Sequence, residues 1–132
     1  MRAIDAHAHV IPGELTQLAA GKQWHGFTVT RDASGQTFLE QGNRRSPVPS
    51  DYFWPPEQRL AHMDSLGVDV QVVSPWTQVN NYHMPGPVGV AISRSCNDHI
   101  AEMTRGWPSR FVGWERCPCK MCPRPSLSWS EA

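Results

Sequence analysis

Residues 59–75 decide the fold class, and their sequence reads RLAHMDSLGVDVQVVSP. Apolar residues recur at three-residue spacing from Leu60 to Leu66, which predicts a helix with one apolar side. Gly67 is a natural stop for that helix, and a β-branched strand follows at once over 68–73. A helix that runs through one glycine into a buried strand is typical of an α/β protein with a parallel sheet.

A second strand is predicted close to the amino terminus, over Arg2–Val10. Side chains alternate between the two faces of a strand, so one face is expected to carry Asp5, His7 and His9. The other face is expected to carry Ile4, Ala6, Ala8 and Val10.

The remaining segments complete an alternating order of strands and helices. Gly26–Glu40 is predicted to form a β-hairpin, and Asn43–Pro56, with its four prolines, an irregular surface loop. Val88–Trp107 has apolar residues at helical spacing, and Arg110–Gly113 begins a third strand. The order strand, hairpin, helix, strand, helix, strand favours a parallel α/β protein.

Composition excludes several classes of partner. The 132 residues are 39% hydrophobic, and 12 basic residues balance 12 acidic ones, so we expect neither a nucleic-acid partner nor a membrane partner. No apolar run approaches the ~20 residues of a transmembrane helix, and no signal peptide opens the chain. We therefore expect a cytoplasmic protein. Three of the four cysteines cluster near the end, which is no disulfide framework for the domain.

Four segments, in order, resemble the amidohydrolase superfamily, in the amidohydrolase 2 family that includes aminocarboxymuconate-semialdehyde decarboxylase. They are IDAHAHVIP at 4–12, RLAHMDSLGVDVQVVSP at 59–75, NDHIAEM at 97–103 and PSRFVG at 108–113. The resemblance implies a (β/α)₈ TIM barrel of the metal-dependent hydrolase type, which typically needs about 250 residues. The expected fold is thus α/β, the truncated N-terminal part of such a barrel, with a β-hairpin insertion after the first strand.

His7 and His9 are the candidate metal ligands. They lie two residues apart on a strand, so both imidazoles project to the same side, and zinc accepts imidazole nitrogen. The pattern alone leaves open a strand with two polar, partly exposed histidines. The resemblance implies that both histidines bind a divalent metal, with Zn²⁺ expected.

The resemblance implies a metal-dependent decarboxylase acting on a small carboxylated substrate, with a homodimer for the full-length relative. Further metal ligands come from later strands in the family, so this piece is expected to be inactive alone. No catalytic residue is assigned. Two alternatives stay open: a metal-dependent hydrolase of the same superfamily, and a non-catalytic short protein whose tail binds metal through Cys117, Cys119 and Cys122.

Three residues are candidates for substrate binding. Arg45 precedes a Ser-Pro-Val segment, and in the family an arginine before a similar Pro-Val grips a carboxylate. The spacing differs here, and a solvated loop arginine is the alternative. Trp76 and Tyr82 lie in the segment after the second strand, which lines the pocket in such barrels. Simple burial at the base of a loop is the alternative for both.

The composition changes abruptly after Gly113. We interpret 1–113 as a partial amidohydrolase barrel domain and 114–132 as an atypical tail, frameshifted or disordered. A one-base loss near Gly113 would account for the change, because in the shifted frame Trp-Glu must give glycine and Met-Cys must give valine.

Overall fold

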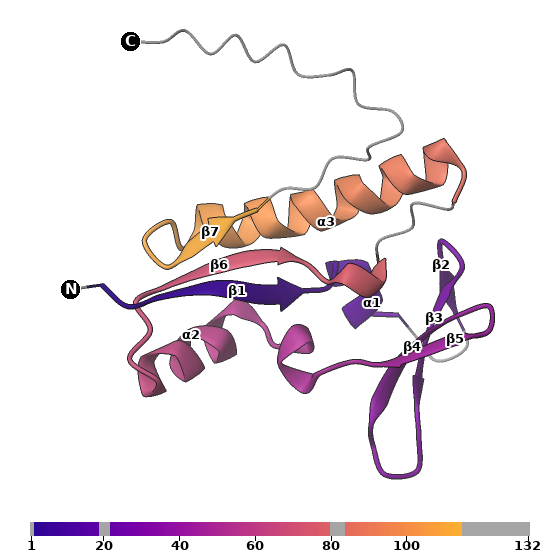
Figure 1. The fold of residues 1–132 in the computed structure, drawn as a ribbon, viewed down its shortest axis with the longest axis horizontal. Coiled ribbons are helices and arrows are strands. Elements are labelled where there is room, and N and C mark those ends of the chain that lie inside the picture. Colours follow the sequence, from indigo (N-terminus) through magenta and orange to yellow (C-terminus); the bar gives the residue numbers. More distant parts are fainter. Residues whose placement is uncertain (1, 19–21, 80–83, 115–132) are drawn as a thin grey trace, which may run out of the picture.

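The computed structural model describes residues 2–18, 22–79 and 84–114. A parallel sheet of order β1-β6-β7 is formed by β1 (Ile4–Val10), β6 (Val70–Pro75) and β7 (Phe111–Gly113), as Figure 1 shows. Helix α2 (Pro56–Ser65) leads from β1 towards β6, and α3 (Gly86–Gly106) joins β6 to β7. The α/β class predicted from the sequence is confirmed.

A second, antiparallel sheet is inserted between β1 and α2, and it has the order β2-β3-β4-β5. The predicted hairpin is its centre, β3 (Phe27–Arg31) and β4 (Thr37–Gln41). Short β2 (Gln23–Trp24) flanks one side and β5 (Arg44–Pro47) the other.

The prediction of an irregular loop over Asn43–Pro56 is wrong in two places. Residues 44–47 pair with β4, and η1 (Ser50–Phe53) is a turn of 3₁₀ helix. Proline is tolerated in β5 because this strand lies at the end of the sheet, where a missing N–H breaks no ladder. Two short helices in connecting segments were not predicted from the sequence: α1 (Gly13–Thr16) and η2 (Thr77–Val79).

Two groups of buried side chains hold the layers together. One fills the space among the inserted sheet, α1 and the amino-terminal half of α3, with Phe27 and Leu15 each 1% exposed. The other joins the parallel sheet to α2 and α3, and it contains Ala8, Val10, Met63, Val73, Ile100, Met103 and Phe111. Both helices therefore pack their apolar sides on one face of the parallel sheet.

Strand β1 contains a bulge that corrects the predicted alternation. Asp5 pairs with Gln71, but Ala8 pairs with Val73, so β1 uses one residue more than β6 between these pairs. Because Gln71 and Val73 share a face of β6, Asp5 lies on the helix-covered face with Ala8 and not on the face of His9. The extra residue also leaves Ala6 exposed, although alternation predicts that it faces the same way as buried Ala8.

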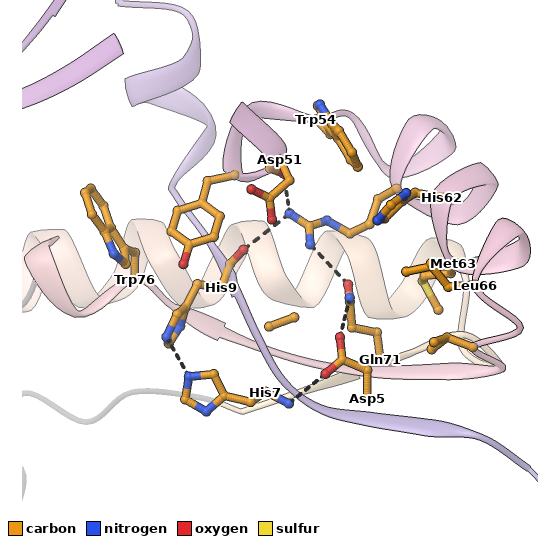
Figure 2. Close-up of a pocket in the computed structure, with 14 residues that line it drawn as sticks. Asp5, His7, His9, Asp51, Trp54, His62, Met63, Leu66, Gln71 and Trp76 are labelled. Carbon is orange, nitrogen blue, oxygen red and sulfur yellow. Dashed lines mark hydrogen bonds between the residues drawn. The ribbon is translucent and has the colours of Figure 1, made fainter. Parts of the chain in front are cut away.

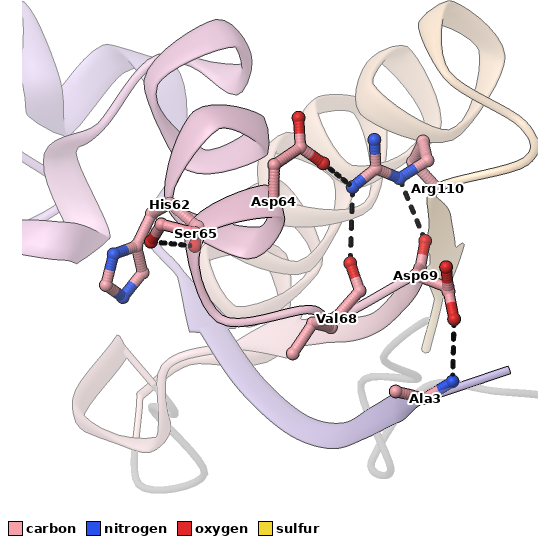
Figure 3. Close-up of polar contacts among 7 residues, drawn as sticks. All are labelled: Ala3, His62, Asp64, Ser65, Val68, Asp69 and Arg110. Atoms are coloured by element: carbon pink, nitrogen blue, oxygen red, sulfur yellow. Dashed lines mark hydrogen bonds and ion pairs between the residues drawn. The ribbon is translucent and has the colours of Figure 1, made fainter.

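An arginine ties the elements together at the amino-terminal end of the parallel strands (Figure 3). Arg110 donates to the carbonyls of Asp69 (2.8 Å) and Val68 (3.2 Å) and forms an ion pair of 2.6 Å with Asp64 of α2. The Asp69 carboxylate in turn accepts the backbone N–H of Ala3 at 2.8 Å. We call these residues the Arg110 latch. Within the described ranges, no helix is long and apolar enough to cross a membrane.

Candidate functional site

The imidazoles of His7 and His9 converge at the carboxyl-terminal half of β1. Their Nε2 atoms lie 3.1 Å apart, and the rings meet edge to face with centroids 4.7 Å apart (Figure 2). Strand pleating brings the two rings together, since residues two apart project from the same side. The two Nε2 atoms thus lie within hydrogen-bonding distance of each other, on the same side of the strand, as the spacing predicts.

His9 is held from both sides of its ring. Its Nδ1 lies 3.0 Å from the hydroxyl of Ser74, which pairs with His9 across β1 and β6. The ring of Tyr52 stands edge to face against it at 5.9 Å. Burial, and then the neighbouring His7, lower the pKa of His9 below its usual 6.5. Lowering the pKa favours the neutral imidazole, which is the form that binds a metal.

A cavity of about 490 Å³ opens beside the two histidines. Trp76 is 8% exposed and forms one wall, with the ring of Tyr52 edge to face against it at 5.5 Å. Further along, Trp54 packs edge to face with His62 at 5.1 Å. Aromatic side chains therefore line much of a cavity that also contains imidazole and carboxylate groups, a combination that suits a small polar ligand.

Arg59 also lines this cavity, and it was missed by the sequence reading. The residue is 3% exposed, although it is charged, and its guanidinium donates three hydrogen bonds. Acceptors are the side chain of Gln71 (3.1 Å) and the carbonyls of His9 (3.3 Å) and Asp51 (2.6 Å). A signal was present, since Arg59 precedes buried Met63 by four residues and so shares its helix face.

The other predicted site residues have different positions. Trp76 lines the cavity but is also buried, at 8% exposed, so its position fits both a pocket residue and simple burial. Arg45 is not among the described residues that line it: its guanidinium binds Glu40 at 3.0 Å and covers the ring of Phe38 at 3.5 Å. Tyr82 and the three tail cysteines lie outside the described residues, so the structure does not place them.

The geometry of the histidine pair fits a shared metal ion. Two nitrogens that each bind one zinc ion at about 2.0–2.1 Å, at angles of roughly 90–110°, lie about 2.9–3.4 Å apart. The observed 3.1 Å falls within this range. No group of three or more histidine, cysteine, aspartate or glutamate side chains forms a metal cluster in the described part of the chain. The described residues thus offer two candidate ligands, fewer than the three protein ligands of a typical catalytic zinc site.

The chain is similar to known decarboxylases, although no family profile matches it. It is 26% identical to 2-amino-3-carboxymuconate-6-semialdehyde decarboxylase of Dictyostelium discoideum over 127 residues. That match covers 94% of this chain, and so extends past Gly113, but it covers 34% of the relative. The chain therefore spans about a third of the curated relative that it matches.

Solved structures show the same fold. The apo IDCase of Metarhizium anisopliae matches with a TM-score of 0.67 at 15% identity, over 89% of this chain and 35% of that one. A dihydroxybenzoic acid decarboxylase from Polaromonas, solved with manganese and the inhibitor 2-nitroresorcinol, matches with a TM-score of 0.56 at 17% identity. Here 91% of this chain and 31% of the neighbour are covered. These neighbours are TIM-barrel amidohydrolases, and the chain corresponds to about a third of each.

Proposed function

We propose that the chain belongs to the amidohydrolase superfamily, in the aminocarboxymuconate-semialdehyde decarboxylase-like family, and that it forms part of a metal-dependent decarboxylase acting on a small carboxylated substrate. The 3.1 Å separation of the His7 and His9 Nε2 atoms, which fits two ligands of one ion, supports this proposal. Since the chain covers about a third of its relatives, the activity is proposed for a whole protein with a completed (β/α)₈ barrel. The piece described here is proposed to be inactive alone.

His7 and His9 are proposed to hold the metal through their Nε2 atoms, with zinc as the expected ion. The bound ion would offset negative charge that develops on the substrate. Ser74 fixes the ring of His9 through Nδ1, which leaves Nε2 free to ligate. Manganese in the Polaromonas neighbour makes Mn²⁺ the second candidate ion.

The substrate would lie in the cavity beside the histidines. Trp76 and Tyr52 give it an aromatic wall. Tyr52 stays protonated, because burial raises the pKa of its phenol above the usual 10.0. Arg45 and Tyr82 stay proposed substrate contacts. For Arg45 to reach a carboxylate in the cavity, it would first have to leave Glu40.

Metal titration of the 132-residue chain tests the proposal. We expect zinc binding that is lost in the His7→Ala, His9→Ala double variant. His62→Ala is the matched control, because this histidine also lines the cavity but packs against Trp54. Zinc binding that survives the double variant and disappears with Cys→Ser changes in the tail would favour the cysteine-dependent metal binder instead.

A second assay separates decarboxylation from hydrolysis. The metal-loaded whole protein is incubated with a panel of aromatic and unsaturated carboxylates, and carbon dioxide release is measured. Cleavage of lactones, amides or esters without release of carbon dioxide would favour the hydrolase alternative.

The domain boundary after Gly113 is also a proposal. We propose that 1–113 is the barrel segment and that 114–132 results from a shifted reading frame or is disordered. Sequencing the coding DNA beyond Gly113 tests the shifted frame, which predicts the rest of a barrel in another frame. Absence of such a remainder would refute the frameshift.

A further inference from the structure

We infer that Arg59 is the residue that positions His7 and His9 with respect to each other, although it touches neither imidazole ring. This inference rests on the proposed function, because it gives Arg59 a purpose at the same site. Its basis is a chain of hydrogen bonds that begins at the guanidinium and ends at the backbone of both histidines (Figure 2).

The first branch of this chain is direct. Arg59 Nη2 donates to the carbonyl of His9 at 3.3 Å and to the carbonyl of Asp51 at 2.6 Å. Asp51 belongs to η1, the turn that presents Tyr52 to the ring of His9. One guanidinium group therefore holds the backbone of His9 and the turn that packs against its side chain.

The second branch reaches His7 through two intermediates. Arg59 Nη1 donates to Gln71 Oε1 at 3.1 Å, and Gln71 Nε2 donates to Asp5 Oδ2 at 2.8 Å. The other oxygen of the Asp5 carboxylate accepts the backbone N–H of His7 at 3.1 Å. The bulge makes this branch available, because it turns Asp5 to the face that carries Gln71.

The need for such bonds follows from the position of β1. Within the described residues, β1 pairs with β6 alone, and the carbonyl of Val10 points towards β6, where it accepts the N–H of Trp76 at 2.9 Å. Backbone groups alternate in direction along a strand, so the carbonyl of His9 points to the opposite, open edge. In the described part of the chain, Arg59 binds the carbonyl of His9 and Asp5 binds the amide of His7.

The Arg110 latch offers a matched control. Arg110 also ties α2 to the strands through backbone carbonyls and a side chain, but it does so at the opposite end of the same sheet. Loss of either arginine removes three hydrogen bonds, so Arg59→Gln and Arg110→Gln both perturb the packing of α2. If Arg59 positions the histidines, only Arg59→Gln should change the local order of the His7 backbone, and Arg110→Gln should not.

Amide hydrogen exchange of the metal-free 132-residue chain tests the inference without metal. The exchange rate of the His7 amide is divided by that of Val73 in the adjacent strand, which corrects for changes in overall stability. We expect Arg59→Gln to raise this ratio about tenfold, because local opening then costs less than global unfolding. Arg110→Gln should leave the ratio unchanged. An equal ratio in both variants would overturn the inference.

If Arg59→Gln does not fold, Gln71→Met is the variant that tests the inference in its place. It keeps the size of the side chain and the guanidinium in place but breaks the link from Arg59 to Asp5. We expect the His7 amide to exchange faster than in the unmodified chain. An unchanged ratio would again count against the positioning role.

Zinc affinity gives a second readout. We expect Arg59→Gln to bind zinc roughly 10- to 100-fold more weakly, the usual effect of losing a group that orients a ligand, and Arg110→Gln to bind as the unmodified chain does. Equal affinities in all three would overturn the inference. If the unmodified chain bound no metal, the two histidines would not form a metal site by themselves, and the exchange ratio would still decide whether Arg59 orders the pair.

Discussion

Replacing Gly113 by alanine should destabilise the junction of β7 and α3. A Cβ at this position would lie 2.6 Å from Ile100 Cγ2 and 3.3 Å from Thr104 Cγ2. The first distance is shorter than real contacts allow, and Ile100 cannot move easily because it is 1% exposed. Inserting one methyl group into such packing typically costs about 1–3 kcal/mol. At roughly 4 °C per kcal/mol for a domain of this size, the melting temperature should fall by about 4–12 °C.

Two variants make this prediction specific. Gly89→Ala in α3 meets nothing within 4 Å, so it should instead stabilise the protein by up to about 1 kcal/mol through helix propensity. Ile100→Leu removes Cγ2 at nearly constant volume and should relieve the clash. The double variant Gly113→Ala, Ile100→Leu should then be at least about 1 kcal/mol more stable than the sum of the single changes predicts. Urea unfolding of the unmodified protein and the four variants measures these differences, and strict additivity would refute the clash.

Two further predictions concern pH and backbone conformation. Burial lowers the pKa of His99 below 6.5, so this imidazole is protonated more readily in the unfolded chain than in the folded one. The free energy of unfolding should therefore be highest above about pH 6.5 and should fall as the pH drops below that value. His99→Gln should reduce this slope, and an equal slope in both proteins would contradict the assignment. Gly67 has φ +68 with nothing within 4 Å of an added Cβ, so Gly67→Ala should cost about 1 kcal/mol from backbone strain alone. Gly67→Asn should cost less in the same unfolding assay, because asparagine tolerates this conformation; equal losses would argue against strain.

Local patterns predicted most of the parallel unit. The helix predicted over Val88–Trp107 is α3, Gly86–Gly106, and the strand predicted after Gly67 is β6. These elements have long apolar periodicity and end at glycine or proline, so neighbouring residues determine them. The short β5 could not be predicted in this way, because its pairing with β4 depends on a partner strand and outweighs the effect of Pro47.

The site was only partly predictable, for a similar reason. Spacing alone predicts that His7 and His9 converge, because pleating is local. The direction of Asp5 depends on the register with Gln71, 66 residues away, and the bulge reverses it. Arg59 was overlooked because a charged helical residue is usually exposed, and the three acceptors that offset its burial come from separate segments of the chain.

The inserted sheet branches off after β1 and rejoins the chain before α2. Its hairpin turn, held by Asp32 through bonds to Ser34 and Gln36, is far along the chain from both attachment points. Lengthening or exchanging that turn would leave the strands that carry the histidines untouched. The hairpin turn can thus be remodelled, while the rest of the inserted sheet stays fixed by the core that it shares with α1 and α3.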